Sequence, residues 1–415
     1  MRASFEVTPK PLLLLSNGHG EDLSGSLIGQ ALGAQGQRVL ALPLVGHGRA
    51  YLQAGIEVLG RTRECSTGGL GYTSLRGQLR EIREGQWAYL LGRLLWLRRH
   101  RSQFGLVIAV GDLLPVLGLW LSGLPGAVYL VAYSSHYEGQ LRLPWPCGWL
   151  LRSKRILEIW SRDQLTAQDL SGQLGRCVRF LGNPFMDGLP TLASGPSPEA
   201  RPHGRQTLAL LPGSRMPEAL QNLLLMLQVL ERLPSQLQQP GRLRLRVALV
   251  SALDQQQLEV QAGRLGWQLE QPAGEGTHVL QRGSLRLELG WGSFGEILQD
   301  SDLVLASAGT ASEQAVGLAK PVLQLCGPGP QFTASFAEAQ RRLLGPGVCC
   351  AIGPSGAPGT LEATAELASQ LLAGQWADGG DWRQGLERIG AERIGPIGGS
   401  GAMAAAIMAL VPITR

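Results

Sequence analysis

Ionisable side chains follow an apolar run near the start of the chain. In LLLLSNGHGEDLSG, residues 12–25, four leucines lead into His19, Glu21 and Asp22. The glycines on either side of His19 allow a tight loop whose backbone can approach a ligand closely. Three ionisable groups within four residues at a strand end favour a chemical role. The structural alternative is that Asp22 or Ser24 serves as the N-cap of the helix that follows.

A second stretch suits a phosphate group. The run LALLPGSRMPE, residues 208–218, places Gly213, Ser214 and Arg215 directly after an apolar strand. Gly213 and Ser214 can turn backbone amides toward an anion, and the Arg215 guanidinium is suited to two phosphate oxygens at once. We expect phosphate recognition at this turn.

A third stretch suits the rest of a nucleotide. In SDLVLASAGTASEQAVG, residues 301–317, an apolar strand runs into Ser307, Gly309, Thr310 and Glu313. Gly309 and Thr310 present amides and a hydroxyl at a helix N-terminus, where the partial positive charge favours a diphosphate. Glu313, one turn further, could accept hydrogen bonds from ribose hydroxyls. A capping box of Thr310 with Glu313 is the structural alternative, and the two can coexist.

Apolar runs alternate with helix-like segments along the chain, which is typical of parallel sheets wound βαβ. Strands are expected at 11–15, 38–44, 104–110, 127–133 and 156–160, and then at 207–211, 243–250, 278–280, 302–306 and 321–325. We therefore predict an α/β protein with two doubly wound Rossmann-like domains facing across a cleft. The expected parts are a first Rossmann-like domain at 1–190, a Pro- and Gly-rich linker at 191–206, a second Rossmann-like domain at 207–395, and a helix at 396–415 that packs back on the first domain.

Composition limits the classes of protein. The 415 residues are 44% apolar and 17% charged, with 57 glycines and 25 prolines, which indicates a loop-rich globular protein. A net charge of +5 suits phosphates, nucleotides or an anionic membrane surface, but is too weak and too evenly spread for a nucleic-acid partner. The six cysteines form no C-x-x-C pair, so we expect a reducing cytoplasm and no structural zinc. We expect no catalytic metal and no cofactor, since the helix terminus near Thr310 and Arg215 can supply the positive charge.

Two kinds of segment bear on membranes. The apolar run at 113–131 is broken by prolines and glycines, which favours a helix at 113–121 and a strand at 127–133 over a membrane span. The segments 87–101 and 143–155 combine tryptophans with a basic end, as interfacial segments do. Either segment could instead pack in a core.

Several of these motifs together resemble the lipid-A-disaccharide synthase family. The matching stretches are LLPGSRMPE at 210–218, SAGTASE at 307–313, KP at 320–321 and GNP at 182–184. More narrowly, the chain resembles the lipid-A-disaccharide synthase-related proteins of cyanobacteria, on SNGHGED at 16–22, YSSHY at 133–137 and PQFT at 330–333.

The resemblance implies a GT-B fold and an inverting glycosyltransferase that moves a sugar from a uridine diphosphate donor to a lipid or glycolipid acceptor. It puts Asp112 forward as the base, with His19 and Glu21 as rivals and Asn17, Gly18 and Gly20 in the acceptor-side loop. The implied donor-binding residues are Gly213, Ser214, Arg215, Ser307, Gly309, Thr310, Glu313 and Gln331. Such an enzyme would act in the cytoplasm, as a peripheral protein on the inner face of the membrane. A nucleotide-sugar 2-epimerase and a non-catalytic nucleotide-sugar-binding protein remain as alternatives.

Overall fold

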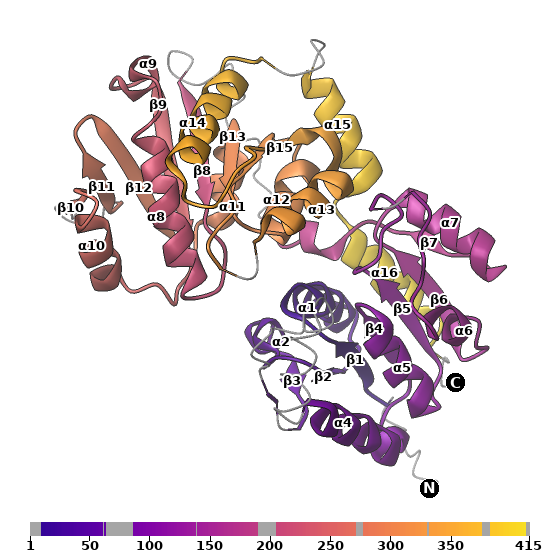
Figure 1. Ribbon diagram of the computed structural model, residues 1–415. Helices are drawn as coiled ribbons and strands as arrows, with labels where there is room; N and C mark the ends of the chain where they lie inside the picture. The colour runs from indigo at the N-terminus through magenta and orange to yellow at the C-terminus, as the bar shows by residue number, and fades with distance from the viewer. Residues whose placement is uncertain are drawn as a thin grey trace, which may run out of the picture. The chain divides into compact units, whose positions relative to one another are not determined.

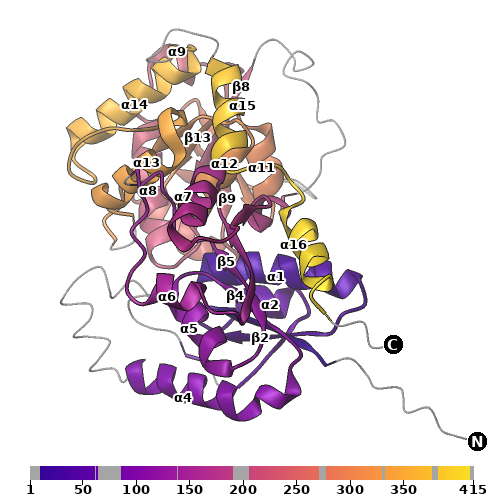
Figure 2. The ribbon, with the colours of Figure 1, turned by 90° about the vertical axis from the view of Figure 1, so that its right-hand side faces the viewer.

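The structure is a computed structural model that divides into two compact units. It describes residues 10–60, 62–63, 86–137, 139–189, 205–270, 277–329, 332–375 and 382–411. The first unit is Met1–Gly188 with Gly395–Arg415, and the second is Leu189–Ile394. Figures 1 and 2 show the elements of both units. The expected linker at 191–206 lies outside the described residues except for its last two.

The first unit is built on a seven-stranded parallel sheet of order β3-β2-β1-β4-β5-β6-β7. Its strands are β1 (Leu12–Ser16), β2 (Val39–Pro43), β3 (Glu57–Val58), β4 (Val107–Val110), β5 (Gly126–Leu130), β6 (Ile156–Ser161) and β7 (Arg179–Phe180). Its helices are α1 (His19–Ala34), α2 (Arg49–Gln53), α4 (Gln86–His100), α5 (Leu113–Ser122), α6 (Cys147–Leu151), α7 (Gln164–Leu174) and α16 (Gly399–Met408), with 3₁₀ turns at Arg101–Gln103 and Pro184–Met186.

Helices cover both faces of this sheet, which explains the four consecutive leucines of β1. Successive strand residues point to opposite faces. Leu12 and Leu14 are buried in a core with α1, α2 and α16, whereas Leu13 and Leu15 are buried in a core with α4, α5, α6 and α7. Figures 1 and 2 show α1 and α4 on opposite sides of the sheet. Burial of a leucine in this way contributes roughly 1.5–3 kcal/mol to the free energy of unfolding. Strand β1 is therefore firmly held in the core and positions the residues that follow it.

The second unit contains an eight-stranded sheet of order β10-β11-β12-β9-β8-β13-β14-β15. Its strands are β8 (Gln206–Leu211), β9 (Leu243–Leu249), β10 (Gln268–Glu270), β11 (Val279–Arg282), β12 (Leu285–Trp291), β13 (Leu303–Ala306), β14 (Val322–Gln324) and β15 (Val348–Cys350). Its helices are α8 (Glu218–Leu230), α9 (Ser235–Gln238), α10 (Gln255–Gly263), α11 (Phe294–Asp300), α12 (Thr310–Gly317), α13 (Ala334–Leu344), α14 (Pro358–Leu372) and α15 (Trp382–Arg393), with a 3₁₀ turn at Gly345–Gly347.

This second sheet is mixed, so the expectation of a wholly parallel sheet is wrong at one edge. Strands β10, β11 and β12 pair antiparallel, and the other strands pair parallel. The antiparallel edge arises because only Gly283 and Ser284 separate β11 from β12, and so short a connection allows only a hairpin.

The chain returns to the first unit through α16. Met403, Ala404 and Ile407 of this helix are buried in the core that α1 shares with β1. The Asp187 carboxylate accepts hydrogen bonds from the backbone amides of Gly398, at 2.5 Å, and Ser400, at 2.7 Å. The first unit is therefore made from two separate stretches of chain.

The apolar run at 113–131 forms a helix and a strand, as the sequence predicts. Helix α5 covers Leu113–Ser122 and strand β5 covers Gly126–Leu130, with Gly123 in a left-handed conformation at φ 75° ending the helix. In the described part of the chain, no helix combines the length and the apolar character needed to span a bilayer.

Candidate functional site

Two loops of the first unit lie side by side because they follow adjacent parallel strands. Strand β1 pairs with β4, and Ser16 lies opposite Val110. The next residues of each chain segment meet: Asn17 Nδ2 donates a hydrogen bond to Asp112 Oδ1 at 2.7 Å. Asp112 also caps helix α5, since the same oxygen accepts from the Leu114 amide at 2.8 Å.

Gly111 allows this approach. Its φ of 137° lies in the region that favours glycine, and a Cβ atom there would come within 2.2 Å of Asn17 Oδ1. The same Cβ would lie 3.3 Å from Glu21 Cγ. Asn17, Glu21 and Asp112 therefore gather around the backbone of Gly111, and the structure brings together two of the three predicted catalytic residues.

The environment of Asp112 adjusts its proton affinity. Burial raises the pKa of this carboxyl group, and the hydrogen bonds from Leu114 and Asn17 oppose the change. A carboxylate whose pKa is moved toward neutrality is a better general base than an exposed one. The geometry and the pKa of Asp112 both suit a proton acceptor.

The first helix begins before Asp22 and Ser24, the two residues considered as its N-cap. Helix α1 starts at His19 with Gly18 as its N-cap, so Gly20 and Glu21 belong to its first turn rather than to a loop. Asp22 and Ser24 lie inside the helix, so the expectation that either of them caps it is wrong. A Cβ at Gly18 would come within 2.3 Å of Glu21 Oε2, so the Glu21 carboxylate lies against this glycine. The side chain of His19 lies outside the described part of the chain.

Asp22, one of the three ionisable residues that the sequence singled out, is buried. It is 3% exposed, and Ser16 Oγ donates a hydrogen bond to its Oδ1 at 2.6 Å. The hydroxyl of Tyr51 in turn donates to Ser16 Oγ at 2.9 Å. Burial raises the pKa of Asp22 to about 7; the nearby Glu21 charge acts in the same direction, and the Ser16 bond opposes it. Burial, reinforced by Asp22, also raises the pKa of Tyr51.

The motif at 133–137 contributes to the first unit mainly through internal hydrogen bonds. Ser134 Oγ donates to Asp163 Oδ2 at 2.7 Å, and Ser135 Oγ donates to Asp169 Oδ2 at 2.7 Å. Asp163 is the N-cap of α7. Tyr133 is the member that reaches the site, because its hydroxyl accepts from the Leu113 amide beside Asp112, at 3.1 Å.

In the second unit, too, two turns lie side by side because they follow adjacent parallel strands. Strands β8 and β13 are adjacent and parallel, and the Ser307 amide donates to the Leu211 carbonyl at 2.9 Å. A Cβ at Gly213, whose φ is 109°, would lie 3.2 Å from the Ser307 carbonyl oxygen. The turn carrying Gly213 and Arg215 is thus next to the turn that opens α12.

In the described part of the chain, no side chain caps the N-terminus of α12. Its N-cap is Gly309, so the expected capping box of Thr310 with Glu313 is not formed. Glu313 is 8% exposed and lies in the first turn. The Ser307 hydroxyl donates to the Leu325 carbonyl at 2.6 Å, so its proton is used within the fold. Backbone amides at the positive end of a helix dipole can bind an anion.

Ser214 and Arg215 belong to the turn whose Gly213 lies against Ser307. Arg215 is half-buried, and among the described residues its guanidinium has neither a hydrogen bond nor an ionic partner. Ser214 is exposed next to it. Gln331 lies outside the described residues. Lys320 of the family motif is structural, since its Nζ donates to the carbonyls of Gln299 and Ser301 at 2.8 and 2.7 Å.

Asn222 of α8 joins two glycine-containing turns of this half-site. Its Nδ2 donates to the Pro212 carbonyl at 2.9 Å, and a Cβ at Gly327 would lie 2.0 Å from its Oδ1. Asn222 is 4% exposed. Sequence reasoning missed it, because a single amide inside an apolar helix has no local signature.

The described residues hold no cluster of three His, Cys, Asp or Glu side chains that could bind a metal ion.

Comparison with solved structures shows the fold. The chain is similar to CalG4, the calicheamicin glycosyltransferase, with a TM-score of 0.59 and 15% identity over 98% of this chain and 100% of that one. It is similar to S. aureus MnaA, solved with UDP, with a TM-score of 0.56 and 12% identity over 98% of each chain. It is also similar to the UDP-GlcNAc 2-epimerase of Neisseria meningitidis bound to UDP-GlcNAc, with a TM-score of 0.51 and 13% identity over 96% of this chain and 99% of that one.

No protein-family model and no curated protein matches the sequence. The two Rossmann-like sheets and the structural likenesses define a GT-B fold. Of these neighbours, one is named a glycosyltransferase and another a UDP-GlcNAc 2-epimerase.

Proposed function

We propose that the protein is an inverting glycosyltransferase, related to lipid-A-disaccharide synthase, that moves a sugar from UDP to a hydroxyl group of a lipid or glycolipid. The observation that carries the proposal is the N-terminus of α12, which no side chain caps, together with the adjacent turn that carries Arg215, whose guanidinium is without a partner among the described residues. A helix terminus and a guanidinium together suit a diphosphate.

The second unit would hold the donor. The amides at Gly309 and Thr310 and the Arg215 guanidinium would contact the diphosphate, and Glu313 would accept hydrogen bonds from the ribose. As the bond between the sugar C1 and the diphosphate oxygen breaks, negative charge grows on the leaving UDP. Groups that are already oriented toward this charge lower the barrier.

The first unit would activate the acceptor. Asp112 takes the proton of the acceptor hydroxyl, and the oxygen attacks C1 from the face opposite the diphosphate. The new C1–oxygen bond forms as UDP departs with the electron pair, so the configuration at C1 inverts. Asn17 holds the Asp112 carboxylate in place through its 2.7 Å hydrogen bond. Glu21, on the same side of Gly111, and His19 are the alternative bases.

The lipid nature of the acceptor rests on the resemblance to the lipid-A-disaccharide synthase-related proteins. A lipid acceptor requires the enzyme to work at a membrane surface, so we place it in the cytoplasm as a peripheral protein of the inner membrane face. The net charge of +5 is compatible with anionic lipids.

A second candidate is a nucleotide-sugar 2-epimerase. The likeness to the Neisseria meningitidis UDP-GlcNAc 2-epimerase, over 96% of this chain, favours it. An epimerase needs no acceptor, and this difference separates the two reactions. A non-catalytic nucleotide-sugar-binding protein would keep the anion site and make no use of Asp112.

The test is to measure UDP binding and then to follow UDP-GlcNAc, UDP-glucose and other UDP-sugars with and without a membrane lipid extract. UDP release that requires the lipid supports the transferase. A sugar inverted at C2, formed without lipid, supports the epimerase. Tight UDP binding with neither reaction supports the binding protein, and absence of UDP binding overturns the donor site and with it the proposal.

A further inference from the structure

One segment of the first unit is rich in cationic side chains. Residues 86–157 contain eight arginines and lysines and two acidic residues, whereas the net charge of the whole chain is +5. The segment therefore has a net charge of +6.

The segment covers one face of the first unit. Helices α4, α5 and α6 bury Leu97, Leu119 and Leu150 in one core, on the side of the sheet opposite α1. Their outer surfaces carry apolar side chains in the open: Leu91 and Leu95 of α4 are 57% and 44% exposed. Helix α4 ends in Arg98, Arg99 and His100.

Two tryptophans stand out on the same part of the unit. Trp145, just before α6, is 90% exposed, and Trp149 of α6 is 60% exposed. Trp149 packs against Trp120 of α5 with ring centroids 5.4 Å apart, so it extends from a fixed base. An exposed indole ring leaves a large apolar surface in contact with water, which is unfavourable. Tryptophan is enriched at the interface between a bilayer and water.

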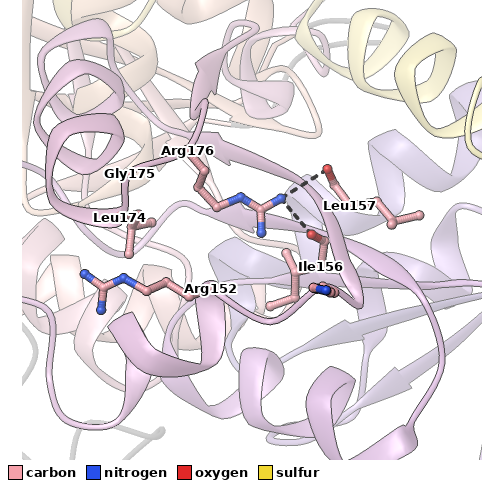
Figure 3. A pocket seen from close by; sticks show the side chains of 7 residues that line it. Arg152, Ile156, Leu157, Leu174, Gly175 and Arg176 are labelled. Atoms are coloured by element: carbon pink, nitrogen blue, oxygen red, sulfur yellow. Dashed lines mark hydrogen bonds between the residues drawn. The ribbon is translucent and has the colours of Figure 1, made fainter.

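A cationic pocket lies directly after these tryptophans in the chain. It has a volume of about 540 Å³ and is lined by Arg152, Lys154, Ile156, Leu157, Leu174, Gly175 and Arg176. Figure 3 shows Arg176 bonded to backbone carbonyls of the pocket wall, including Ile156 O at 2.7 Å. Arg152 donates to the Gln173 carbonyl at 2.6 Å. These bonds fix both guanidinium groups at the pocket, and Lys154 is exposed at its edge.

We propose that the surface formed by Trp145, Trp149, Arg152, Lys154 and Arg155, the docking surface, binds an anionic lipid bilayer. The indoles would enter the headgroup region, and the cations would contact lipid phosphates, with the pocket taking one headgroup. Charge complementarity selects this occupant, because the segment carries a large cationic excess next to exposed apolar side chains. The inference specifies the membrane contact in the proposed function, and it needs no assumption about the donor or the reaction.

The test is co-sedimentation of the full chain with vesicles of phosphatidylglycerol and phosphatidylcholine in equal amounts, and with vesicles of phosphatidylcholine alone, at 50 and 500 mM salt. We expect binding to the anionic vesicles at low salt and at least a tenfold loss at high salt, because salt screens the attraction. We expect at least a fivefold loss in Trp145→Ala/Trp149→Ala and in Lys154→Gln/Arg155→Gln.

Two controls remove exposed apolar or cationic side chains from the second unit. Ile352→Ala removes a 98% exposed apolar side chain of the second unit, and Arg242→Gln/Arg264→Gln removes two of its exposed charges. These controls should bind vesicles like the parent. Thermal melting of each variant verifies that it is folded.

Four results would overturn the inference: no binding to anionic vesicles, binding equal on uncharged vesicles, docking-surface variants that bind like the parent, or binding to single-stranded RNA in preference to vesicles. Dimer formation that the two tryptophan changes abolish, without vesicle binding, would assign the surface to a second copy. UDP affinity is measured in parallel. Vesicle binding without UDP binding refutes the proposed function and leaves this inference standing, and the reverse result refutes only this inference.

Discussion

Asn17 and Asp112 are 95 residues apart in the chain, yet their side chains are joined by a 2.7 Å hydrogen bond from Nδ2 to Oδ1. This bond lowers the pKa of Asp112 against the effect of burial. Asn17→Ala should therefore raise that pKa. Because the base acts in its ionised form, the acid side of the pH–rate profile should move to higher pH. An unchanged profile in a folded Asn17→Ala variant would mean that Asp112 is not the group that titrates.

Loss of the base should affect turnover and spare donor binding. We expect Asp112→Asn, and either His19→Ala or Glu21→Gln, to reduce turnover by about a hundredfold or more, the usual scale for losing a general base. Calorimetry should give a UDP affinity within about threefold of the parent, because these residues belong to the first unit. Full turnover in all three folded variants would remove the catalytic role of this edge of the sheet.

Arg215→Ala should weaken UDP binding, because it removes a charge-assisted hydrogen bond worth roughly 1.5–3 kcal/mol, or about tenfold to a hundredfold in affinity. Glu313→Ala should also weaken UDP binding, because it removes the proposed acceptor for the ribose hydroxyls. Arg242→Ala is the matched control, since Arg242 precedes β9 at the amino end of the sheet and ligands bind at the carboxyl ends. Equal affinities in Arg215→Ala, Glu313→Ala and the control would contradict the assignment.

Asn222→Asp should make UDP binding depend on pH. Below its pKa the new carboxyl group can donate to the Pro212 carbonyl as Asn222 does, at 2.9 Å. Above it, a buried carboxylate faces that carbonyl and repels it. Glu218 and Arg215 are the charged groups near this turn, and they are unchanged in the variant.

The measured quantity is the ratio of variant to parent affinity for UDP at each pH. We expect a ratio within about threefold at pH 5.5 and a loss of at least tenfold at pH 8. Asn222→Ala should bind weakly at both pH values. A constant ratio for Asn222→Asp would show that the bond to Pro212 does not position the turn.

Asp22 should make the stability of the protein fall as pH rises. Its pKa in the folded state, about 7, lies above the ordinary value of 3.8, so the folded protein holds the proton more tightly than the unfolded chain does. The stabilisation is complete below about pH 4 and is lost as pH rises to 7. This difference in pKa corresponds to roughly 4 kcal/mol.

Asp22→Asn keeps an acceptor for the Ser16 hydroxyl and carries no charge. Urea unfolding should show that it is more stable than the parent at pH 8 and that its stability changes less between pH 5 and pH 8. Asp254→Asn is the control, because Asp254 is the exposed N-cap of α10. If Asp22→Asn and the parent have parallel pH profiles, Asp22 is ionised in the folded protein throughout this range.

Strands buried on both faces were predictable, because they require unbroken apolar runs. Strands β1 and β13 lie close to their expected positions for this reason. Strands β3 and β7 have two residues each and were missed, since so short a segment has no periodicity. Strand β12 alternates apolar and charged residues, and its pairing depends on the hairpin with β11.

The parts of the site formed by loops at neighbouring strand ends were predictable. The buried side chains that bond within the fold were harder to predict. Asp22 matched the pattern of an N-cap, but in the structure its carboxylate bonds to Ser16 at the end of β1. Gly18 caps α1 without a side chain, so the true start of the helix had no sequence signal. The role of Asn222 depends on Pro212 and Gly327, which come together only after the sheet has formed.

The return of α16 to the first unit has a consequence for synthesis on the ribosome. Met403, Ala404 and Ile407 complete a core with residues of α1 that emerge nearly four hundred positions earlier, so this core closes only after the second unit has been made. The second unit is an uninterrupted stretch and can fold while the first waits, with the apolar side of α1 open to chaperones. Contacts of such long sequence separation also slow folding. A fragment ending at residue 188 would leave that side of α1 permanently uncovered and should aggregate, whereas a circular permutant that joins α16 directly to β1 would make the first unit continuous.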